Sequence, residues 1–285
     1  MQLSYSKLKT YGQCPLRYRF TYLDRLPRRP RRLFRAGRRV HHALMRWLVY
    51  AKSGSPRWED VAAAYDAAWD AADDPALKGS KDYDEGLQIL REYHEVNLER
   101  ACRPVFLEHK FSLRLGGHVL TGAIDRVDAT DDGYEVIDYK LHRDIATQAE
   151  VDEDLQLGLY HLAMEEAHGV RPEALTLYFL RHNIQRTTSR TPEQVRDLKR
   201  LVVLTGEDIT QDRQWSACKG DHCSGCDFRS LCPSHTGAPV PLYVPPRTRI
   251  DAQLTLLQPE PQMPFAMASR PVEAVDADNQ LALPL

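Results

Sequence analysis

The chain has 285 residues, of which 42% are hydrophobic, so it can bury one sizeable core, or one core with a helical appendage. A formal net charge of −2 excludes a protein that is basic throughout. The sequence has no signal-peptide pattern and no apolar run near the roughly 18 residues that a membrane helix needs. We therefore expect a soluble, cytoplasmic protein without membrane contact.

The first hundred residues are predicted to be mainly helical. Residues 3–23 carry apolar side chains at helical spacing, and Pro15 stands where a second helical segment can open. Three further amphipathic helices are predicted, over residues 33–51, 58–72 and 82–102.

Positive charge is concentrated between the first two of these helical regions, where eight arginines fall within residues 25–39. Such a cluster suits contact with phosphates, because neutralising them releases condensed counterions, although a solvated helix face gives the same pattern. We expect this stretch to bind nucleic acid. The arginines selected for this role are Arg28, Arg31, Arg32 and Arg35.

From residue 104 the apolar period changes from that of a helix to that of a strand. Three consecutive strands are predicted, over residues 105–115, 119–127 and 134–140. Gly116-Gly117 makes a tight turn between the first two. A helix, a buried strand and a second helix follow, over residues 151–168, 175–180 and 191–205. This order, with an antiparallel meander between helices, predicts an α/β sandwich and not a doubly wound parallel fold.

Two aspartates and a lysine form the first chemical pattern. Asp125 lies near the end of the second predicted strand and Asp138 lies on the third, so a hairpin brings their carboxylates together. Such oxygen ligands suit Mg²⁺ or Mn²⁺. Lys140 emerges on the same face as Asp138 and can orient an attacking water or stabilise charge on a phosphate. The alternative interpretation is a set of cross-strand ion pairs on an exposed face.

Residues outside the hairpin extend this pattern. A neutral imidazole at His41 can complete a metal site that carboxylates begin, and His42 competes for that role. Gln156 and Tyr160 are four residues apart on one face of the next predicted helix. Glu108, before the end of the first strand, is either an acid beside the site or an exposed strand residue.

The cysteines form the second chemical pattern. Cys223, Cys226 and Cys232 place three thiolates within one short segment, which suits zinc or an iron–sulfur cluster better than disulfides in a reducing compartment. Cys218 would complete a local site as the fourth ligand. Cys14 would complete a site that joins the two ends of the domain. Spacing alone leaves both the ligand and the metal open.

Four motifs, in their order along the chain, resemble the RecB-like branch of the PD-(D/E)xK nuclease superfamily. They read LSYSKLKTYGQCPLRYRFTYL, LTGAIDRVDATDDGYEVIDYK, DLQLGLY and CSGCDFRSLCP. That branch includes nuclease domains of AddB-type helicase-nucleases and CRISPR-adaptation exonucleases with an iron–sulfur cluster. The resemblance covers roughly residues 2–235. It implies a restriction-endonuclease-like α/β fold, in which helices flank a mixed sheet and an iron–sulfur cluster joins the N- and C-terminal segments. It also implies phosphodiester hydrolysis by a metal-activated water.

The resemblance also implies a role for individual residues. The implied ligands of Mg²⁺ or Mn²⁺ are His41, Asp125, Asp138 and the backbone carbonyl of Tyr139. Lys140 is implied to serve the water, and Gln156 and Tyr160 to contact DNA or brace the site. The implied ligands of a structural [4Fe–4S] cluster are Cys14, Cys223, Cys226 and Cys232.

We therefore expect one nuclease domain over residues 1–235, followed by a disordered tail over 236–285. The domain would consist of a helical part, a catalytic α/β core and a cysteine-rich end, over residues 1–103, 104–205 and 206–235. The end of the tail is similar to peptides that bind the bacterial sliding clamp. The residues that carry this similarity are Gln280, Leu281, Leu283 and Leu285.

The predicted function is a metal-dependent DNA nuclease, an exonuclease on single-stranded or unwound DNA that serves repair or recombination. No phosphate-cradling GxxxxGK[ST] loop is present, so unwinding would require a helicase partner. The alternative is a non-catalytic DNA-binding scaffold, stapled by zinc or an iron–sulfur cluster and recruited to the sliding clamp.

Overall fold

The computed structural model describes residues 1–28, 32–70, 77–99 and 102–240, apart from the side chains of residues 32–36 and 53. No helix within these ranges is long and apolar enough to cross a membrane. The chain divides into two compact units. The first, here called the catalytic unit, comprises residues 1–13 and 29–215, and the second, the cysteine unit, comprises residues 14–28 and the chain from residue 216 onward.

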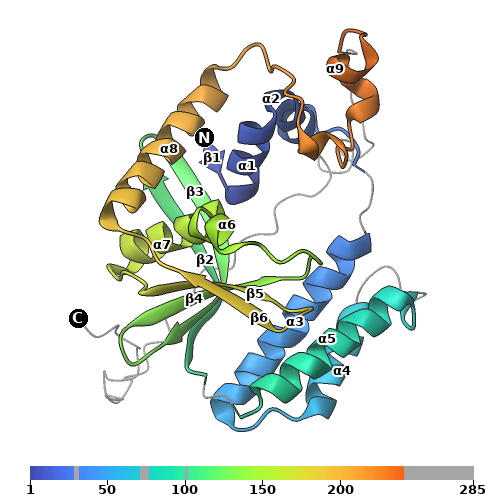
Figure 1. The fold of residues 1–285 in the computed structure, drawn as a ribbon, viewed down its shortest axis with the longest axis vertical. Helices are drawn as coiled ribbons and strands as arrows, with labels where there is room; N and C mark the ends of the chain where they lie inside the picture. The colour runs from blue at the N-terminus through green and yellow to red at the C-terminus, as the bar shows by residue number, and fades with distance from the viewer. Residues whose placement is uncertain (29–31, 71–76, 100–101, 241–285) are drawn as a thin grey trace, which may run out of the picture. The chain divides into compact units, whose positions relative to one another are not determined.

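The catalytic unit is built on a mixed sheet. Its strands are β1 (Gln2–Leu3), β2 (Pro104–Leu115), β3 (His118–Ala129), β4 (Tyr134–Lys140), β5 (Ala174–Phe179) and β6 (Ile184–Thr188). They follow the order β1-β3-β4-β5-β6, and β2 pairs with β3. The long β2–β3 hairpin and the β3–β4 and β5–β6 pairs are antiparallel, whereas β1–β3 and β4–β5 are parallel. This confirms the predicted mixed α/β sheet with flanking helices (Figure 1).

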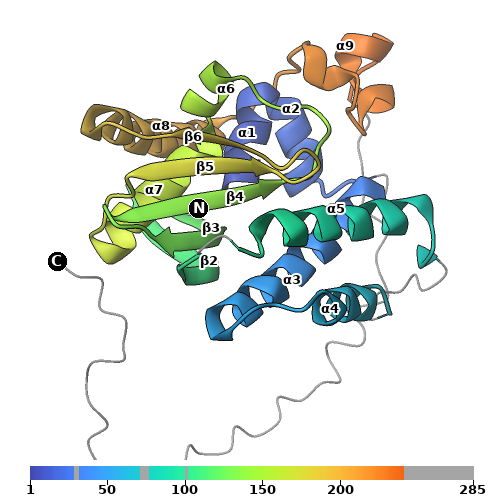
Figure 2. The same cartoon turned by 60° about the horizontal axis from the view of Figure 1, so that its bottom comes forward.

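Within the described residues, seven α-helices of the catalytic unit accompany the sheet. They are α1 (Tyr5–Gln13), α3 (Arg32–Ser53), α4 (Trp58–Asp70), α5 (Lys81–Asn97), α6 (Gln148–Asp152), α7 (Leu155–His168) and α8 (Pro192–Gln211). Helices α3, α4 and α5 lie together, while α7 and α8 lie together against another part of the sheet (Figures 1 and 2). The predicted start of the last helix is confirmed, since Thr191 caps α8 and Pro192 occupies its first turn.

An aromatic core joins α3, α4 and α5 to the sheet. Trp47, Trp69 and Tyr93 are buried there with Tyr139 of β4 and Tyr178 of β5. The hydroxyl groups of Tyr93 and Tyr139 lie 3.1 Å apart, within hydrogen-bonding distance. Because Tyr139 stands between Asp138 and Lys140, this core fixes the strand that carries both.

The predictions for local structure were wrong at three places. Residues 2 and 3 form strand β1, parallel to β3, although a helical region was predicted from residue 3 onward. The helix expected over residues 151–168 is interrupted, because the Asp154 side chain accepts a hydrogen bond from the Leu157 amide and starts α7 anew after α6. Strand β6 was not predicted. Four of its five residues are exposed, so it lacks the alternation of buried and exposed side chains by which strands are recognised.

The cysteine unit contains short helical segments and few buried apolar residues. Its segments are α2 (Pro15–Tyr18), a π-helical turn (Arg19–Leu23), two 3-10 turns (Asp221–Cys223 and Arg229–Leu231) and α9 (Pro233–Thr236). As predicted, Pro15 opens α2. The amide of Leu16 donates to the carbonyl of Ser216, which joins the two parts of this unit.

Candidate active site and cysteine pocket

The β3–β4 hairpin brings the two predicted aspartates together. Arg126 pairs with Ile137, so Asp125 and Asp138 come next along the two antiparallel strands. The backbone amide of Tyr139 donates to Asp125 Oδ2 at 3.0 Å. This bond holds the Asp125 carboxylate against the strand that carries Asp138.

Three side chains beside this hairpin have the geometry of a cation site. One ligand atom each of His41, Glu108 and Asp125 can be chosen so that all lie within 4.8 Å of one another. His41 Nδ1 is 3.7 Å from Asp125 Oδ2. No other group of three His, Cys, Asp or Glu side chains converges in this way within the described ranges. An imidazole with two carboxylates is a donor set that suits Mg²⁺ or Mn²⁺.

Glu108 is the member of this group for which the sequence allowed two interpretations, an acid beside the site or an exposed strand residue. It lies within β2 but has φ of 47°, in the left-handed region that side chains rarely adopt. Such a conformation costs roughly 1–2 kcal/mol and persists where the surrounding structure enforces it, often at functional sites. Its neighbours Leu107 and His109 pair regularly with β3, so the distortion is confined to the residue that faces Asp125.

Asp138 and Lys140 belong to a closed ring of polar contacts. Lys140 Nζ lies 2.5 Å from Asp138 Oδ2 and donates to Gln156 Oε1 at 2.7 Å. Gln156 Nε2 donates to Tyr160 Oη at 2.7 Å, and Tyr160 Oη donates to Asp138 Oδ1 at 3.2 Å. The ring exists because α7 begins at Leu155 and thus presents Gln156 and Tyr160 on one face.

Burial and neighbouring charges shift the pKa values of four side chains at this site. Burial and then the charge of Asp138 raise the pKa of Asp125 well above its usual range, and the same two causes raise that of Glu108. Burial lowers the pKa of His41. For Lys140 burial acts to lower the pKa, but the ion pair with Asp138 outweighs it and the pKa is raised. Lys140 is therefore a charged donor at neutral pH, and its charge and that of Lys110 only partly oppose the raised pKa values of Asp125 and Glu108.

The site opens into a cleft of about 840 Å³. Residues from α1, α3 and the sheet line it, among them Tyr5, Arg38, Arg46, Lys140 and His142. Tyr5 and Arg46 were not singled out from the sequence. Their place depends on how α1 and α3 pack on the sheet, for which no local sequence signal exists.

One of the predicted nucleic-acid contacts lines this cleft, and the others lie elsewhere or outside the described part. Arg28 is exposed and belongs to the cysteine unit. Arg31 and the side chains of Arg32 and Arg35 lie outside the described residues, as does the clamp-binding segment at 280–285. Gln156 is the predicted DNA contact that lines the cleft.

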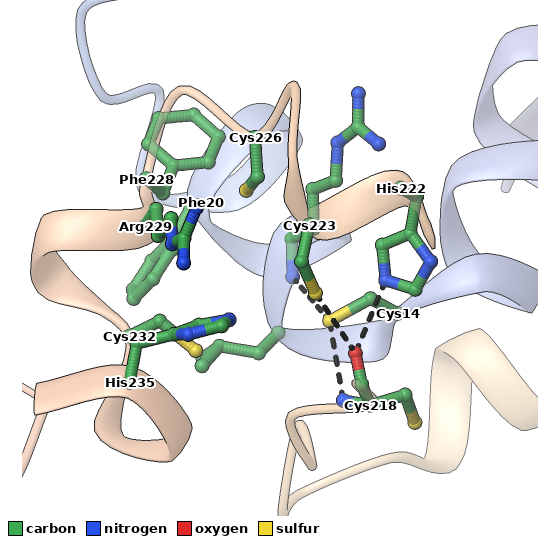
Figure 3. Close-up of a pocket in the computed structure, with 12 residues that line it drawn as sticks. Cys14, Phe20, Cys218, His222, Cys223, Cys226, Phe228, Arg229, Cys232 and His235 are labelled. Carbon is green, nitrogen blue, oxygen red and sulfur yellow. Dashed lines mark hydrogen bonds between the residues drawn. The ribbon is translucent and has the colours of Figure 1, made fainter. Parts of the chain in front are cut away.

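The cysteine unit contains a second pocket, lined by five cysteines together with apolar side chains such as Leu16, Phe20 and Phe228. Figure 3 shows the thiols of Cys14, Cys223, Cys226 and Cys232 around one space, while the thiol of Cys218 points away from Cys14. Cys218 is also exposed, whereas Cys14 is buried. Cys14 Sγ accepts from the amides of Arg17 at 3.4 Å and Cys218 at 3.5 Å.

The fold and the acidic hairpin define a nuclease of the PD-(D/E)xK type. The model of the PD-(D/E)XK nuclease superfamily matches residues 2–233, and the chain belongs to this superfamily. Its substrate is therefore nucleic acid, and it is an enzyme that cleaves phosphodiester bonds.

The individual proteins to which this chain is similar share low sequence identity with it. A solved structure from Eubacterium rectale, described as a candidate exonuclease, superposes with a TM-score of 0.53 at 13% identity, covering 88% of this chain and 92% of that one. At this identity the likeness shows a common fold alone. The Gene 69 protein of Mycobacterium phage D29 is 25% identical over 270 residues, which span 81% of this chain and 96% of that protein. Its name states no activity.

Proposed function

We propose that this protein is a metal-dependent DNA exonuclease of the RecB-like branch, acting on single-stranded or unwound DNA in repair or recombination. The observation that carries the proposal is the convergence of His41, Glu108 and Asp125 beside the Asp138–Lys140 pair at the base of an open cleft. Hydrolysis of a phosphodiester requires acidic side chains that can bind a metal ion and a positively charged donor beside them, and here the ammonium group of Lys140 is that donor.

The proposed ligands of Mg²⁺ or Mn²⁺ are His41, Asp125, Asp138 and the Tyr139 carbonyl, to which the geometry adds Glu108. The half-buried acids fit a cation, since burial and the nearby Asp138 carboxylate raise the pKa of Asp125 in spite of the Tyr139 amide and Lys140, and a cation would offset this negative charge. A bound divalent cation would supply Lewis-acid activation of water and would neutralise charge on the phosphate. The neutral imidazole favoured at His41 is the form that binds metals.

Lys140 is proposed to donate hydrogen bonds to the attacking water or to the phosphate. Its raised pKa keeps it charged, so it acts as a donor and not as a free base. Gln156 and Tyr160 are proposed to hold the side chains of Lys140 and Asp138 in position through the polar ring. Gln156 is also proposed to contact DNA from the cleft wall.

For the cysteine pocket we propose a structural [4Fe–4S] cluster held by Cys14, Cys223, Cys226 and Cys232. The inward thiols and the two amides directed at Cys14 Sγ support this set over one with Cys218. A zinc site would need thiolates about 3.8 Å apart, given zinc–sulfur bonds of about 2.3 Å. Within the described ranges no three thiols meet within 4.8 Å, which favours the larger cluster. Recruitment to a sliding clamp through Gln280 and Leu285 remains a prediction from the sequence.

The test is cleavage of end-labelled single-stranded and duplex DNA by the full chain, with Mg²⁺ and Mn²⁺ compared. We expect metal-dependent release of short products from single strands, and loss of at least about 100-fold in rate for Asp138→Ala. DNA binding and any brown colour should be retained in that variant. Unchanged cleavage by Asp138→Ala would show that the site is misassigned. A wild-type protein that binds DNA but never cleaves it would favour the scaffold alternative.

A further inference from the structure

The end of β4 that carries the acidic site extends beyond its backbone pairing with β3. Among the described residues, the last register pair between these two strands is Arg126 with Ile137. Strand β4 continues to Lys140 and pairs there with β5 on its other side. The segment from Asp138 to Lys140 therefore depends on side chains for its position relative to β3, although it must meet Asp125 of that strand.

Tyr139 makes the contacts that join this segment to its surroundings. Its backbone amide donates to Asp125 Oδ2 at 3.0 Å, and Arg126 Nη1 donates to its hydroxyl oxygen at 3.1 Å. Asp125 and Arg126 are successive residues of a strand, so their side chains leave opposite faces of the sheet. Burial lowers the pKa of His41, and a hydrogen bond with the Tyr139 backbone acts against this shift. Tyr139 thus contacts two proposed metal ligands and, behind them, Arg126.

Arg126 is itself fixed from several sides. It is 7% exposed, and its Nε donates to Asp128 Oδ1 at 2.6 Å while its Nη2 pairs with Asp128 Oδ2. Nη1 donates to the hydroxyl oxygen of Tyr93 at 3.2 Å as well as to that of Tyr139. A guanidinium is a rigid planar group, so an acid that holds two of its nitrogens also fixes the direction of the third. Asp128 therefore determines where Arg126 can hold the Tyr139 hydroxyl.

This ion pair is an unusual component of a core that is otherwise aromatic and aliphatic. Desolvation of two buried charges offsets much of their attraction, and apolar side chains of similar size often stabilise a core as well or better. Hydrogen bonds, in contrast to apolar contacts, depend strongly on direction. The Arg126–Asp128 pair can thus fix the position of Tyr139 more closely than apolar packing would.

We infer that Arg126 is a positioning residue of the metal site, which, held by Asp128, fixes Tyr139 and through it the Asp125 carboxylate and the Tyr139 carbonyl. This inference rests on the proposed function, from which it takes the metal ligands. Arg126 acts through Tyr139 and not by contact with the metal or the substrate. Groups that orient metal ligands in this way typically change metal affinity or activity about tenfold to 100-fold when they are removed.

The experiment titrates the full chain with Mn²⁺ in the absence of DNA and measures free Mn²⁺ by electron paramagnetic resonance. Tyr139→Phe removes the hydroxyl that Arg126 holds and retains the ring and the backbone, and it should weaken Mn²⁺ binding about tenfold. Tyr178→Phe is the matched control. The Tyr178 hydroxyl is buried in the same core, where it accepts from Asn97 at 3.0 Å and donates to Asn183 at 3.1 Å. Its loss should leave Mn²⁺ affinity within about twofold of the wild type.

A double variant tests Arg126 directly. Arg126→Met combined with Asp128→Leu replaces the ion pair by apolar groups of similar size and leaves no buried charge unpaired, so the protein should remain folded. We expect Mn²⁺ binding to weaken about tenfold to 100-fold while the melting temperature stays within a few degrees of the wild-type value. A loss of Mn²⁺ affinity no larger than that of Tyr178→Phe would show that the ion pair has a structural role alone.

A second measurement needs no metal. In chelator, hydrogen exchange at the amide of residue 139 reports whether its bond to Asp125 is held. Exchange at this amide should be about tenfold faster in Tyr139→Phe and in the double variant, and unchanged in Tyr178→Phe. Unchanged exchange in Tyr139→Phe would overturn the positioning role. A wild-type protein that binds no Mn²⁺ would instead contradict the proposed metal site, so the two failures are distinguishable.

Discussion

The two candidate metal sites of this chain are built in opposite ways. The acidic site stands on a wide mixed sheet whose strands, aromatic core and Arg126–Asp128 ion pair are complete without any ligand. The cysteine pocket is surrounded by short helical turns, and few apolar side chains are buried around it. A fold that is already stable can position ligands for chemistry, whereas a unit with little core needs the ligand for its own stability.

The largest expected effect is therefore on the cysteine unit. Cys226→Ser should abolish the absorbance near about 400 nm that the proposed iron–sulfur cluster would give, and expose residues 216–240 to proteolysis. The catalytic unit should keep its circular dichroism. Cys218→Ser is the matched control, since the Cys218 thiol points away from Cys14 in Figure 3. Loss of this absorbance in Cys218→Ser but not in Cys14→Ser would show that Cys218, and not Cys14, is the fourth ligand.

At the acidic site the corresponding substitution should lower the rate and leave the protein folded. Lys140→Met removes the charged donor and leaves the sheet intact, so we expect the cleavage rate to fall about 100-fold to 1,000-fold. The melting temperature should fall by several degrees, because the buried Asp138 carboxylate is left without its ion-pair partner. Single-turnover cleavage and thermal melts of the same preparation measure the two effects. Unfolding of the variant would mean that the site also maintains the fold.

A smaller effect concerns the stability that the Asp125 carboxylate costs the protein when no metal ion is bound. The raised pKa of Asp125 means that the folded state favours its protonated form. The stability that this gives is full below the usual aspartate pKa of about 4, and it is lost as the pH rises through the raised value. Asp125→Asn should therefore stabilise the metal-free protein at pH 8, because the neutral amide brings no charge into this site.

Denaturant unfolding of both proteins in chelator, at pH 5 and pH 8, checks the prediction for Asp125→Asn. The gain should be larger at pH 8, and an excess of Mg²⁺ should stabilise only the wild type. Asparagine retains an oxygen that can accept from the Tyr139 amide, so the backbone contact is preserved. A gain that is equal at both pH values would contradict the assigned cause.

The sequence predicted the parts of this site that follow from local rules. A tight turn sets the hairpin register, so the meeting of Asp125 and Asp138 could be foreseen. The contact between Gln156 and Tyr160 follows from helical spacing. Glu108 was left open because its backbone conformation is imposed by the surrounding structure and has no local signal. The part of the cleft that α3 lines could not be predicted, since it depends on how α3 packs on the sheet. The dense arginines near the start of α3 instead favoured other residues as nucleic-acid contacts.

The smallest predicted effect separates the two roles of Glu108, ligand and strained residue. Glu108→Gln and Glu108→Gly both remove the carboxylate, so both should weaken Mn²⁺ binding about tenfold to 100-fold. Only glycine adopts the left-handed conformation without steric cost, which is roughly 1–2 kcal/mol for other residues. Glycine also gains freedom in the unfolded chain, which opposes part of this gain. Glu108→Gly should thus be more stable than Glu108→Gln by about 1 kcal/mol, measured by denaturant unfolding without metal. If the two variants were equally stable, β2 would hold residue 108 without strain, and its conformation would be no sign of function.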